Sequence, residues 1–265
     1  MRFAAAFAFL SLCLSLRAEE PTPQLLPVAR DLLEKTGYRG TVLVYDFQEE
    51  THFASHPSIA EERFIPASTF KILSTQAALQ SGVVADKDSI LKWDGLERGR
   101  QETNRDLPLT TAFRISSVPH YQELVREIGP DRMLAFVNSI PYGNQDISGG
   151  IDQFWLTGAL SISPLEQIEF LVRLYQHDLP FDPSVMDSVK QMMLSPEDEP
   201  IRYAAKTGWA VLPESRNIGW WVGWAEKEGR RLFFATVLDS NQPRDDFGHT
   251  RIDITKKTVE SIFEK

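Results

Sequence analysis

The sequence is almost free of cysteine. Cys13 is the only one in 265 residues, and it lies in an N-terminal segment that we expect to be removed. Without that segment the chain has no thiol, which excludes disulfide bonds and thiol chemistry. An exported protein without disulfides depends on its core, and a chain of this length that is 42% hydrophobic can bury a sizeable one.

Histidine is scarce as well, and its spacing is unlike that of a metal site. Among the five histidines only His52 and His56 are close in sequence, and their surroundings (THFASH) resemble a strand. The pattern of a zinc hydrolase, with two histidines and a glutamate on one helix, is missing. We therefore expect no metal, with the histidines at the surface or in structural positions.

The chain has fewer basic than acidic residues. Lysine and arginine total 28 against 37 acidic residues, which gives a net charge of −9. Loss of the N-terminal segment would also remove Arg2 and Arg17 and make the charge two units more negative. This balance argues against nucleic acid and against anionic membrane surfaces as partners. An anionic substrate would need a local cationic pocket.

Long apolar runs are missing beyond the first residues. Residues 3–16 form one such run after Arg2, and Ala18 precedes two acidic residues. The run is too short to span a membrane and predicts a secretory signal peptide over residues 1–18, although Leu16 is large for its place before the cut. A lipoprotein site at Cys13, disfavoured by the bulky Leu12, and an uncleaved anchor are the alternatives. We expect a secreted protein without a stable membrane anchor.

The remaining chain, 19–265, reads as one domain of mixed α/β (α+β) class, without repeats or low-complexity segments. Helical periodicity or helix-end signals predict helices over residues 25–37, 64–82, 119–129, 131–140, 161–178, 182–194 and 253–265. Ser163, Pro164 and Glu166 form a capping-box pattern in the fifth of these. Strand-like runs cover residues 40–47, 51–55, 201–209, 217–226 and 231–240.

Successive strands joined by tight turns predict an antiparallel sheet. We expect the terminal helices to cover one face and an inserted all-helical subdomain, about residues 64–194, to cover the other. The sheet subdomain would comprise about residues 19–63 and 195–265. A cleft between the two is a natural place for a small ligand.

Ser68 and Lys71 are the first candidates for chemistry. They lie three residues apart at the start of the predicted helix 64–82, so their side chains are neighbours on one face. A serine nucleophile needs a base within reach and an oxyanion site, and a helix start offers backbone N–H groups for the latter. Taken alone, the pair is unremarkable, and a capping serine with a lysine that extends to solvent is the favoured explanation.

Three weaker motifs follow in a fixed order. KTGW (206–209) lies late in a predicted strand, where a strand edge could pair with an extended substrate and Lys206 and Thr207 could hold a carboxylate. SSV (116–118) lies between a strand-like stretch and a helix, and YGN covers residues 142–144. Each is common alone, but S-x-x-K, S-x-V, YGN and KTG in this order form a much stronger signal.

With these motifs the chain resembles the class D, or oxacillinase-type, serine β-lactamases over nearly its whole mature length. The resemblance includes the segments PASTFK (66–71), KWDG (92–95), RDLPL (105–109), SSVPHYQELVREIG (116–129), FWLTGALSISPLEQ (154–167) and GWWVGW (219–224). It implies the fold shared by serine β-lactamases and penicillin-binding proteins, and hydrolysis of β-lactam antibiotics with resistance as the result. It also implies location in the periplasm of a Gram-negative bacterium.

The resemblance further implies residue roles. Ser68 would be acylated, Lys71 would react with carbon dioxide (the only cofactor expected) to form a carboxylated general base, and Ser116 would relay a proton to the lactam nitrogen. Burial can lower the pKa of a lysine from about 10.4 by several units, as carboxylation requires. The other implied residues are an apolar shell of Phe70, Val118, Trp155 and Leu156, oxyanion donors on Ser68 and Trp209, and substrate contacts from Tyr142, Asn144, Leu156, Lys206, Thr207, Gly208 and Arg251.

Some questions stay open at this level. Arg244 lies near Arg251 in sequence, so either could be the arginine that pairs with the substrate carboxylate. A β-lactam sensor or a penicillin-binding domain that is acylated without turnover is the alternative function. The chain could be a monomer or a homodimer, and its substrate range depends on the loops around residues 93–105 and 213–217.

Overall fold

The computed structural model describes residues 22–195 and 200–264 of the chain. The predicted signal peptide lies outside these residues. A six-stranded sheet runs through the middle of the molecule in the order β1-β3-β2-β8-β7-β6, antiparallel except where β1 pairs with β3. Its strands are β1 (Gln24–Leu25), β2 (Arg39–Asp46), β3 (Thr51–Ala54), β6 (Arg202–Val211), β7 (Asn217–Lys227) and β8 (Arg230–Ser240).

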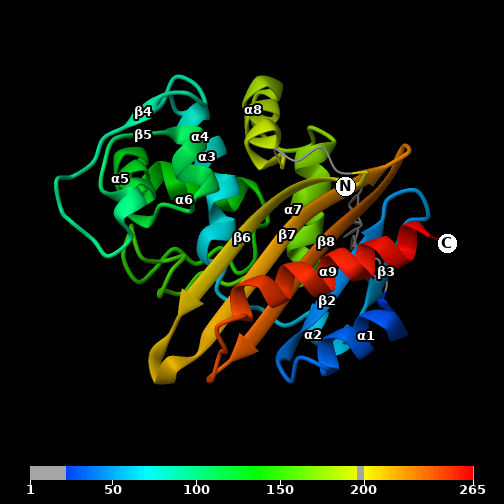
Figure 1. Cartoon of the computed structure of the whole chain (residues 1–265). Helices are drawn as coiled ribbons and strands as arrows, with labels where there is room; N and C mark the ends of the chain where they lie inside the picture. Colours follow the sequence, from blue (N-terminus) through cyan, green and yellow to red (C-terminus); the bar gives the residue numbers. More distant parts are fainter. Residues whose placement is uncertain (1–21, 196–199, 265) are drawn as a thin grey trace, which may run out of the picture.

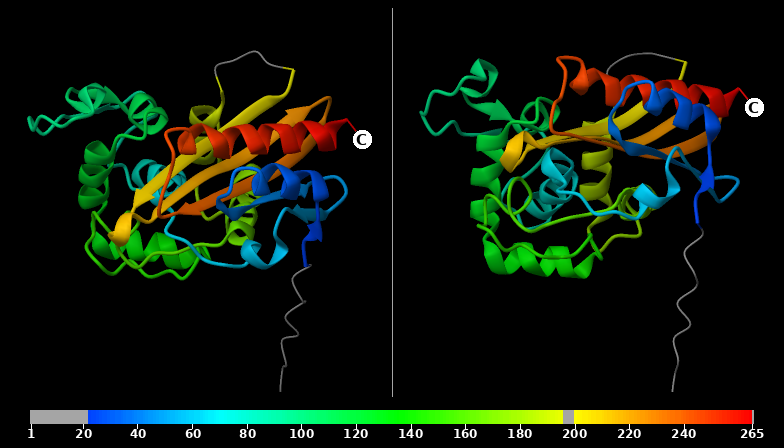
Figure 2. Two further views of the ribbon diagram at one scale, coloured as in Figure 1. Left: turned by 60° about the horizontal axis from the view of Figure 1, so that its bottom comes forward. Right: turned by 90° about the horizontal axis from the view of Figure 1, so that it is seen from below.

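Helices cover both faces of this sheet (Figures 1 and 2). The terminal helices α1 (Pro27–Glu34) and α9 (Phe247–Phe263) lie on one face, as predicted. The helices of the middle of the chain lie beyond the other face: α2 (Pro57–Ala60), α3 (Lys71–Gln80), α4 (Leu109–Arg114), α5 (Val118–Ile128), α6 (Pro130–Ser139), α7 (Pro164–Tyr175) and α8 (Pro183–Met193). The described residues also include three 3₁₀ turns: η1 (Ala67–Phe70) and η2 (Gln101–Thr103) among the middle helices, and η3 (Pro213–Ser215) between β6 and β7.

The two covered faces explain the nearly continuous apolar run of β7. Trp220 and Val222 point into the core beneath the middle helices, whereas Trp221 and Ala225 point into the core beneath α1 and α9. A strand buried on both faces cannot alternate apolar with polar residues. The sheet thus separates two hydrophobic cores.

The helix α7 begins as its sequence predicts. The Ser163 hydroxyl accepts a hydrogen bond from the Glu166 backbone N–H at 3.2 Å, and the Glu166 carboxylate accepts one from the Ser163 N–H at 2.8 Å. These bonds satisfy two donors that have no partner within the helix itself. The predicted capping box is confirmed.

Four details of the prediction are wrong. The middle block is not all-helical, because β4 (Ile90–Leu91) and β5 (Leu107–Pro108) form a small antiparallel ribbon there. The stretch before Ser116 is helix α4 rather than a strand. Pairing with β7 extends β6 to Val211, so KTGW lies in the middle of the strand. The helix α9 begins at Phe247, because that side chain is buried against Tyr38, with ring centroids 5.1 Å apart.

No helix within the described residues has the length and apolar character needed to cross a membrane.

Candidate active site

Ser68 and Lys71 are brought together at the junction of η1 and α3. The Lys71 Nζ donates a hydrogen bond to the Ser68 Oγ at 3.2 Å. Lys71 is fully buried, and Ser68 retains 5% of its exposure. The predicted single helix over residues 64–82 is therefore a 3₁₀ turn that leads into an α-helix, with the serine in the turn.

Hydrogen bonds to both layers of the fold fix this turn. The Ala67 N–H donates to the Trp155 carbonyl at 2.9 Å, and the Trp220 indole N–H of the sheet donates to the Ile65 carbonyl at 2.8 Å. Ala67, directly before the serine, has a φ of +50°, a conformation that is costly for any residue other than glycine. The backbone around Ser68 is held in a conformation that it would not adopt alone.

Burial controls the protonation of Lys71. Desolvation lowers its pKa from 10.5 to about 7, with a further contribution from the positive charge of Arg100. The amine also lies 4.6 Å from the centre of the Tyr121 ring. Near neutral pH a large fraction of this amine is uncharged and can act as a base or nucleophile.

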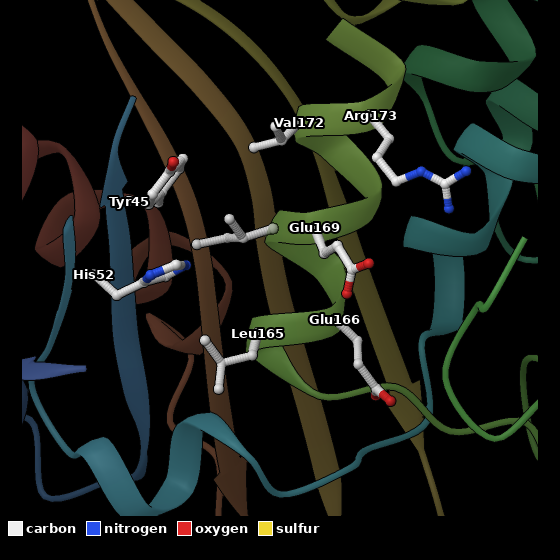
Figure 3. Close-up of a pocket in the computed structure, with 8 residues that line it drawn as sticks. Tyr45, His52, Leu165, Glu166, Glu169, Val172 and Arg173 are labelled. Carbon is white, nitrogen blue, oxygen red and sulfur yellow. The ribbon is translucent and has the colours of Figure 1, made fainter. Parts of the chain in front are cut away.

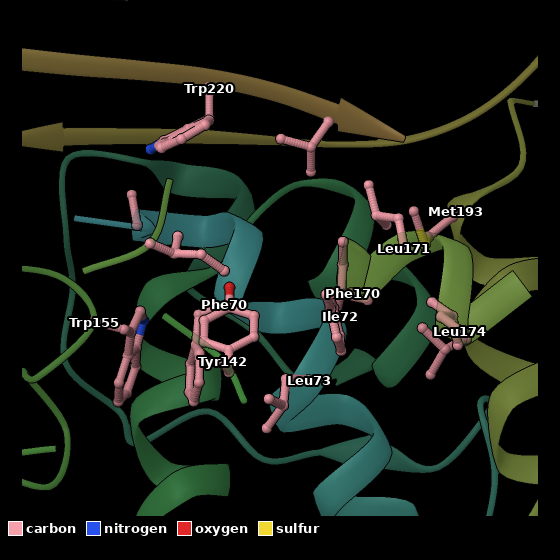
Figure 4. Close-up of a cluster of buried hydrophobic side chains, with 14 of the residues drawn as sticks. Phe70, Ile72, Leu73, Tyr142, Trp155, Phe170, Leu171, Leu174, Met193 and Trp220 are labelled. Atoms are coloured by element: carbon pink, nitrogen blue, oxygen red, sulfur yellow. The ribbon is translucent and has the colours of Figure 1, made fainter. Parts of the chain in front are cut away.

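Of the four residues expected to form an apolar shell, two are buried in the hydrophobic core and two are half-buried. Phe70 and Trp155 are buried and stacked with ring centroids 5.6 Å apart, and Figure 4 shows both beside Tyr142 at one end of the larger core. Val118 and Leu156 are half-buried. The Trp155 Nε1 is buried and has no hydrogen-bond partner among the described residues. A buried donor without a partner is costly, so this atom suits a bound acceptor.

Lys206 and Ser116 form the second polar pair. The Lys206 Nζ donates hydrogen bonds to the Ser116 Oγ and to the Thr207 carbonyl, the latter at 2.9 Å. Burial, and then the charges of Lys71, Arg251 and Arg100, lower the pKa of Lys206 well below its usual value. Ser116 has a φ of +56° and sits in the loop between α4 and α5.

Two residues that the motifs did not single out hold this loop. The Ser117 hydroxyl lies 2.7 Å from the His120 Nδ1, and the His120 Nε2 lies 3.0 Å from the Arg105 carbonyl. Because a carbonyl only accepts, the Nε2 carries the proton and the Nδ1 accepts from Ser117. His120 is therefore a structural histidine, and only its spacing of three residues from Ser117 could have indicated this.

The strand β6 packs directly against the Ser68 turn. A Cβ atom on Gly208 would lie 2.9 Å from the Pro66 carbonyl oxygen and 3.2 Å from the Thr69 nitrogen. Only a glycine permits this approach without a shift of the backbone. The next residue, Trp209, thus lies in a strand that borders the turn.

The sequence predicts Arg251 as the arginine that pairs with the substrate carboxylate, with Arg244 as the alternative. The two side chains have different surroundings in the structure. Arg251 lies on α9 with 6% exposure, and its Nε and Nη1 have no hydrogen-bond partner among the described residues. Burial lowers its pKa to about 10. Arg244 instead donates to the Thr36 carbonyl at 2.9 Å and stacks over Tyr38. Of the two arginines, Arg251 is thus the one with buried nitrogen atoms that have no partner among the described residues.

Tyr142 and Asn144 do not join this group. Tyr142 is fully buried against Phe70 and Phe170, and burial raises its pKa. The Asn144 side chain donates to the Ala159 carbonyl at 2.8 Å and accepts from the Ser161 N–H at 3.0 Å. The prediction that both contact substrate is not supported, because a buried phenol and an amide engaged with its own loop have structural positions.

A separate groove lies away from these residues. It has a volume of about 380 Å³ and is lined by Tyr45, His52, Leu165, Glu166, Ile168, Glu169, Val172 and Arg173, as Figure 3 shows. None of the predicted site residues borders it. Among the described residues no cluster of three or more His, Cys, Asp or Glu side chains could hold a metal ion.

Comparisons with known proteins identify the family. Residues 40–264 match the family model of the penicillin binding protein transpeptidase domain. The chain is 41% identical over 221 residues to the β-lactamase OXA-48 of Klebsiella pneumoniae, a match that covers 83% of this chain and 82% of OXA-48. The chain belongs to the class D β-lactamases. Its resemblance to them is confirmed, and so are the fold class and the assignment as a serine β-lactamase.

Other relatives agree with this placement. The probable β-lactamase YbxI of Bacillus subtilis is 39% identical over 218 residues, which is 82% of this chain and 80% of YbxI. The crystal structure of a class D β-lactamase from Nostoc matches with a TM-score of 0.83 and 36% identity over 88% of this chain and 98% of its own. As a class D enzyme the protein hydrolyses β-lactams and supports resistance to them.

Proposed function

We propose that this class D enzyme opens β-lactams through an acyl-enzyme on Ser68, with Lys71 as the site of the general base for both steps. The observation that carries this proposal is the fully buried Lys71 amine, with its pKa lowered to about 7, at 3.2 Å from the Ser68 Oγ. A base placed this way can take the serine proton at neutral pH.

A residue of the site can be assigned to each bond that forms or breaks in the reaction. The Ser68 Oγ bonds to the lactam carbonyl carbon as its proton passes to the base at Lys71. The lactam C–N bond then breaks, and the base passes that proton to the lactam nitrogen through Ser116, which Lys206 holds by a hydrogen bond. Water next attacks the ester carbonyl and gives a proton to the freed base at Lys71. The ester C–O bond then breaks, and the base passes this proton to the Ser68 Oγ. Backbone N–H groups of Ser68 and Trp209 stabilise the oxyanion in both steps.

Carbon dioxide is the cofactor that we propose for Lys71. It would supply, as a carboxylate on the lysine nitrogen, a more efficient acceptor of the serine and water protons than the amine. The residues present fit such a group, because the neutral fraction of Lys71 can react and the Trp155 Nε1 lacks an acceptor. Trp155 would donate to that group, while Phe70 excludes water from behind it.

Substrate would lie along the outer edge of β6. Thr207 and Gly208 would border it from the strand, and Leu156 and Val118 from the helical layer. Arg251 would supply positive charge for the substrate carboxylate, and the Lys206 amine would donate a hydrogen bond to it. Arg251 thus gives a local positive charge in a protein with a net charge of −9.

The test is turnover of nitrocefin by the purified protein with added bicarbonate. We expect many colour changes per enzyme molecule, none for Ser68→Ala, and a trapped acyl-enzyme for Lys71→Ala. Mass spectrometry after penicillin treatment measures the trapped species. Full turnover by Lys71→Ala would disprove the role of the lysine, and a single stoichiometric colour change by the natural sequence would favour a sensor or peptidase.

We also propose export by the signal peptide over residues 1–18, into the periplasm of a Gram-negative host, as a monomer or homodimer. The apolar run of residues 3–16 and the absence of any other cysteine than Cys13 support this. Intact mass of the protein from a periplasmic extract gives the cleavage site, and sedimentation gives the number of subunits. A cytoplasmic protein that keeps residue 1 would contradict the proposal.

A further inference from the structure

The side chain of Trp209 is fixed although it is 43% exposed. Its Nε1 donates a hydrogen bond to the Asn217 Oδ1 at 2.8 Å. Its ring also packs on Phe247, with centroids 5.1 Å apart, and a Cβ atom on Gly248 would lie 3.2 Å from it. An exposed indole held on its edge and on its ring presents a rigid surface to its neighbours.

The side-chain amide of Asn217 can accept the hydrogen bond from the Trp209 indole in only one orientation. Its Nδ2 donates to the Ser215 carbonyl at 2.6 Å while its Oδ1 faces the indole. A carbonyl only accepts and an indole N–H only donates, so a flipped amide would lose both bonds. Asn217 is nearly buried at the start of β7 and ties the β6–β7 turn to the Trp209 ring.

Arg251 lies against this fixed ring. Its guanidinium carbon is 5.4 Å from the centre of the Trp209 ring. The guanidinium also packs closely on β7, since a Cβ atom on Gly219 would lie 3.0 Å from the Arg251 Nη1. No described carboxylate or carbonyl holds the Nε or Nη1. Packing therefore helps to set the direction of the guanidinium, and the indole supplies one of the packing surfaces.

We propose that Asn217 and the Trp209 indole, together the indole clamp, position Arg251 to bind the carboxylate of the β-lactam. This rests on the proposed function, and it adds Asn217 as a positioning residue that does not touch substrate. An arginine aligned in advance forms both bonds to a carboxylate without first losing rotamer freedom. Loss of the clamp therefore weakens recognition of the carboxylate specifically.

The test compares acylation by nitrocefin with acylation by its neutral methyl ester. Ring opening changes the colour at the acylation step, so stopped-flow absorbance gives the second-order rate constant whether or not the ester on Ser68 is later hydrolysed. Asn217→Ala removes the acceptor of the clamp, and Trp209→Phe removes its donor. The exposed Asn138→Ala on α6 is the matched control.

For both clamp variants we expect the rate constant for the acid to fall about five- to tenfold, the effect of losing one partly buried hydrogen bond. For Asn217→Ala, the variant of the residue that does not touch substrate, the rate constant for the ester should change less than about twofold. The double variant should lose no more than either single variant, because both remove the same contact. Arg251→Ala should abolish the preference for acid over ester, and Asn138→Ala should change neither rate.

Equal losses on acid and ester would overturn the clamp, because they would indicate a general disturbance of β6. An unchanged rate for the acid in Asn217→Ala, or a preference that survives Arg251→Ala, would also overturn it. Failure of the proposed function has a different signature: the natural sequence would open one ring per molecule and then stop, while the comparison of acid with ester could still be made.

Discussion

Replacing Lys71 by methionine should stabilise the protein while it inactivates the enzyme. Lys71 is fully buried, and its pKa is about 7 instead of 10.5. At about 1.4 kcal/mol per pKa unit, this shift costs the folded state roughly 4 kcal/mol at pH 7. Methionine has a similar length and no charge to desolvate, and loss of the bond to Ser68 removes only about 1 kcal/mol.

The stability gained by Lys71→Met should depend on pH, because the protonation of Lys71 differs between the folded and unfolded states. Below pH 7 the lysine is protonated in the folded and unfolded states, so the full cost of burial is present. Between pH 7 and 10.5 the unfolded chain binds the proton and the folded chain does not, so the stability of the natural protein rises with pH. The advantage of Lys71→Met should therefore be largest at pH 6–7 and shrink steadily toward pH 10.

Urea unfolding at pH 6.5, 8 and 9.5, without bicarbonate, measures this difference. The exposed Lys35→Met at the end of α1 is the matched control and should change the free energy of unfolding very little. A Lys71→Met protein less stable than the natural one at pH 6.5 would refute the reasoning. An advantage that does not depend on pH would refute it equally, since packing rather than charge would then be the cause.

Three further predictions concern activity. Without added bicarbonate, turnover of nitrocefin should fall as the pH drops through about 7, because Lys71 becomes protonated, and bicarbonate should restore part of it; a rate indifferent to bicarbonate would count against this. Trp155→Phe removes only the unpartnered N–H and should raise the bicarbonate concentration for half-maximal activity several-fold, measured by titration; an unchanged titration would contradict it. Gly208→Ala places a methyl group 2.9 Å from the Pro66 oxygen and should lower kcat/KM by about tenfold or more with the fold intact by circular dichroism; a fully active variant would show that the strand can shift freely.

Local sequence signals predicted the elements whose causes are themselves local. The capping box of α7 and the neighbouring positions of Ser68 and Lys71 depend on residues three apart, which a helix brings together whatever surrounds it. The antiparallel order of β7 and β8 follows from a short turn between them. The structure of these elements is determined almost entirely by residues that lie a few positions apart in the sequence.

Contacts between distant segments set the features that the sequence did not reveal. The end of β6 at Val211 depends on pairing with Asn217, and the start of α9 depends on burial of Phe247 against Tyr38. The YGN motif was assigned to substrate because it accompanies the other motifs, but Tyr142 fills the core under Phe70. A motif can persist because it supports the site from behind.

The choice between Arg244 and Arg251 shows the same limit. Both lie in a polar stretch that looks like one loop, and neither composition nor spacing separates them. In the fold one stacks over Tyr38 and the other is buried with two nitrogen atoms free of described partners. Only the three-dimensional surroundings decide which arginine remains available.

The reactive groups are divided between the two layers of the molecule. Ser68 and Lys71 belong to the helical side, whereas Lys206 and Trp209 belong to the sheet, and the Trp220 indole joins the sides at Ile65. A small slip of one layer over the other would separate Ser68 from Lys206 and Trp209 while leaving every helix and strand formed. Catalytic activity therefore depends on how tightly the two layers pack against each other. On gentle warming, activity should be lost at a lower temperature than the secondary structure.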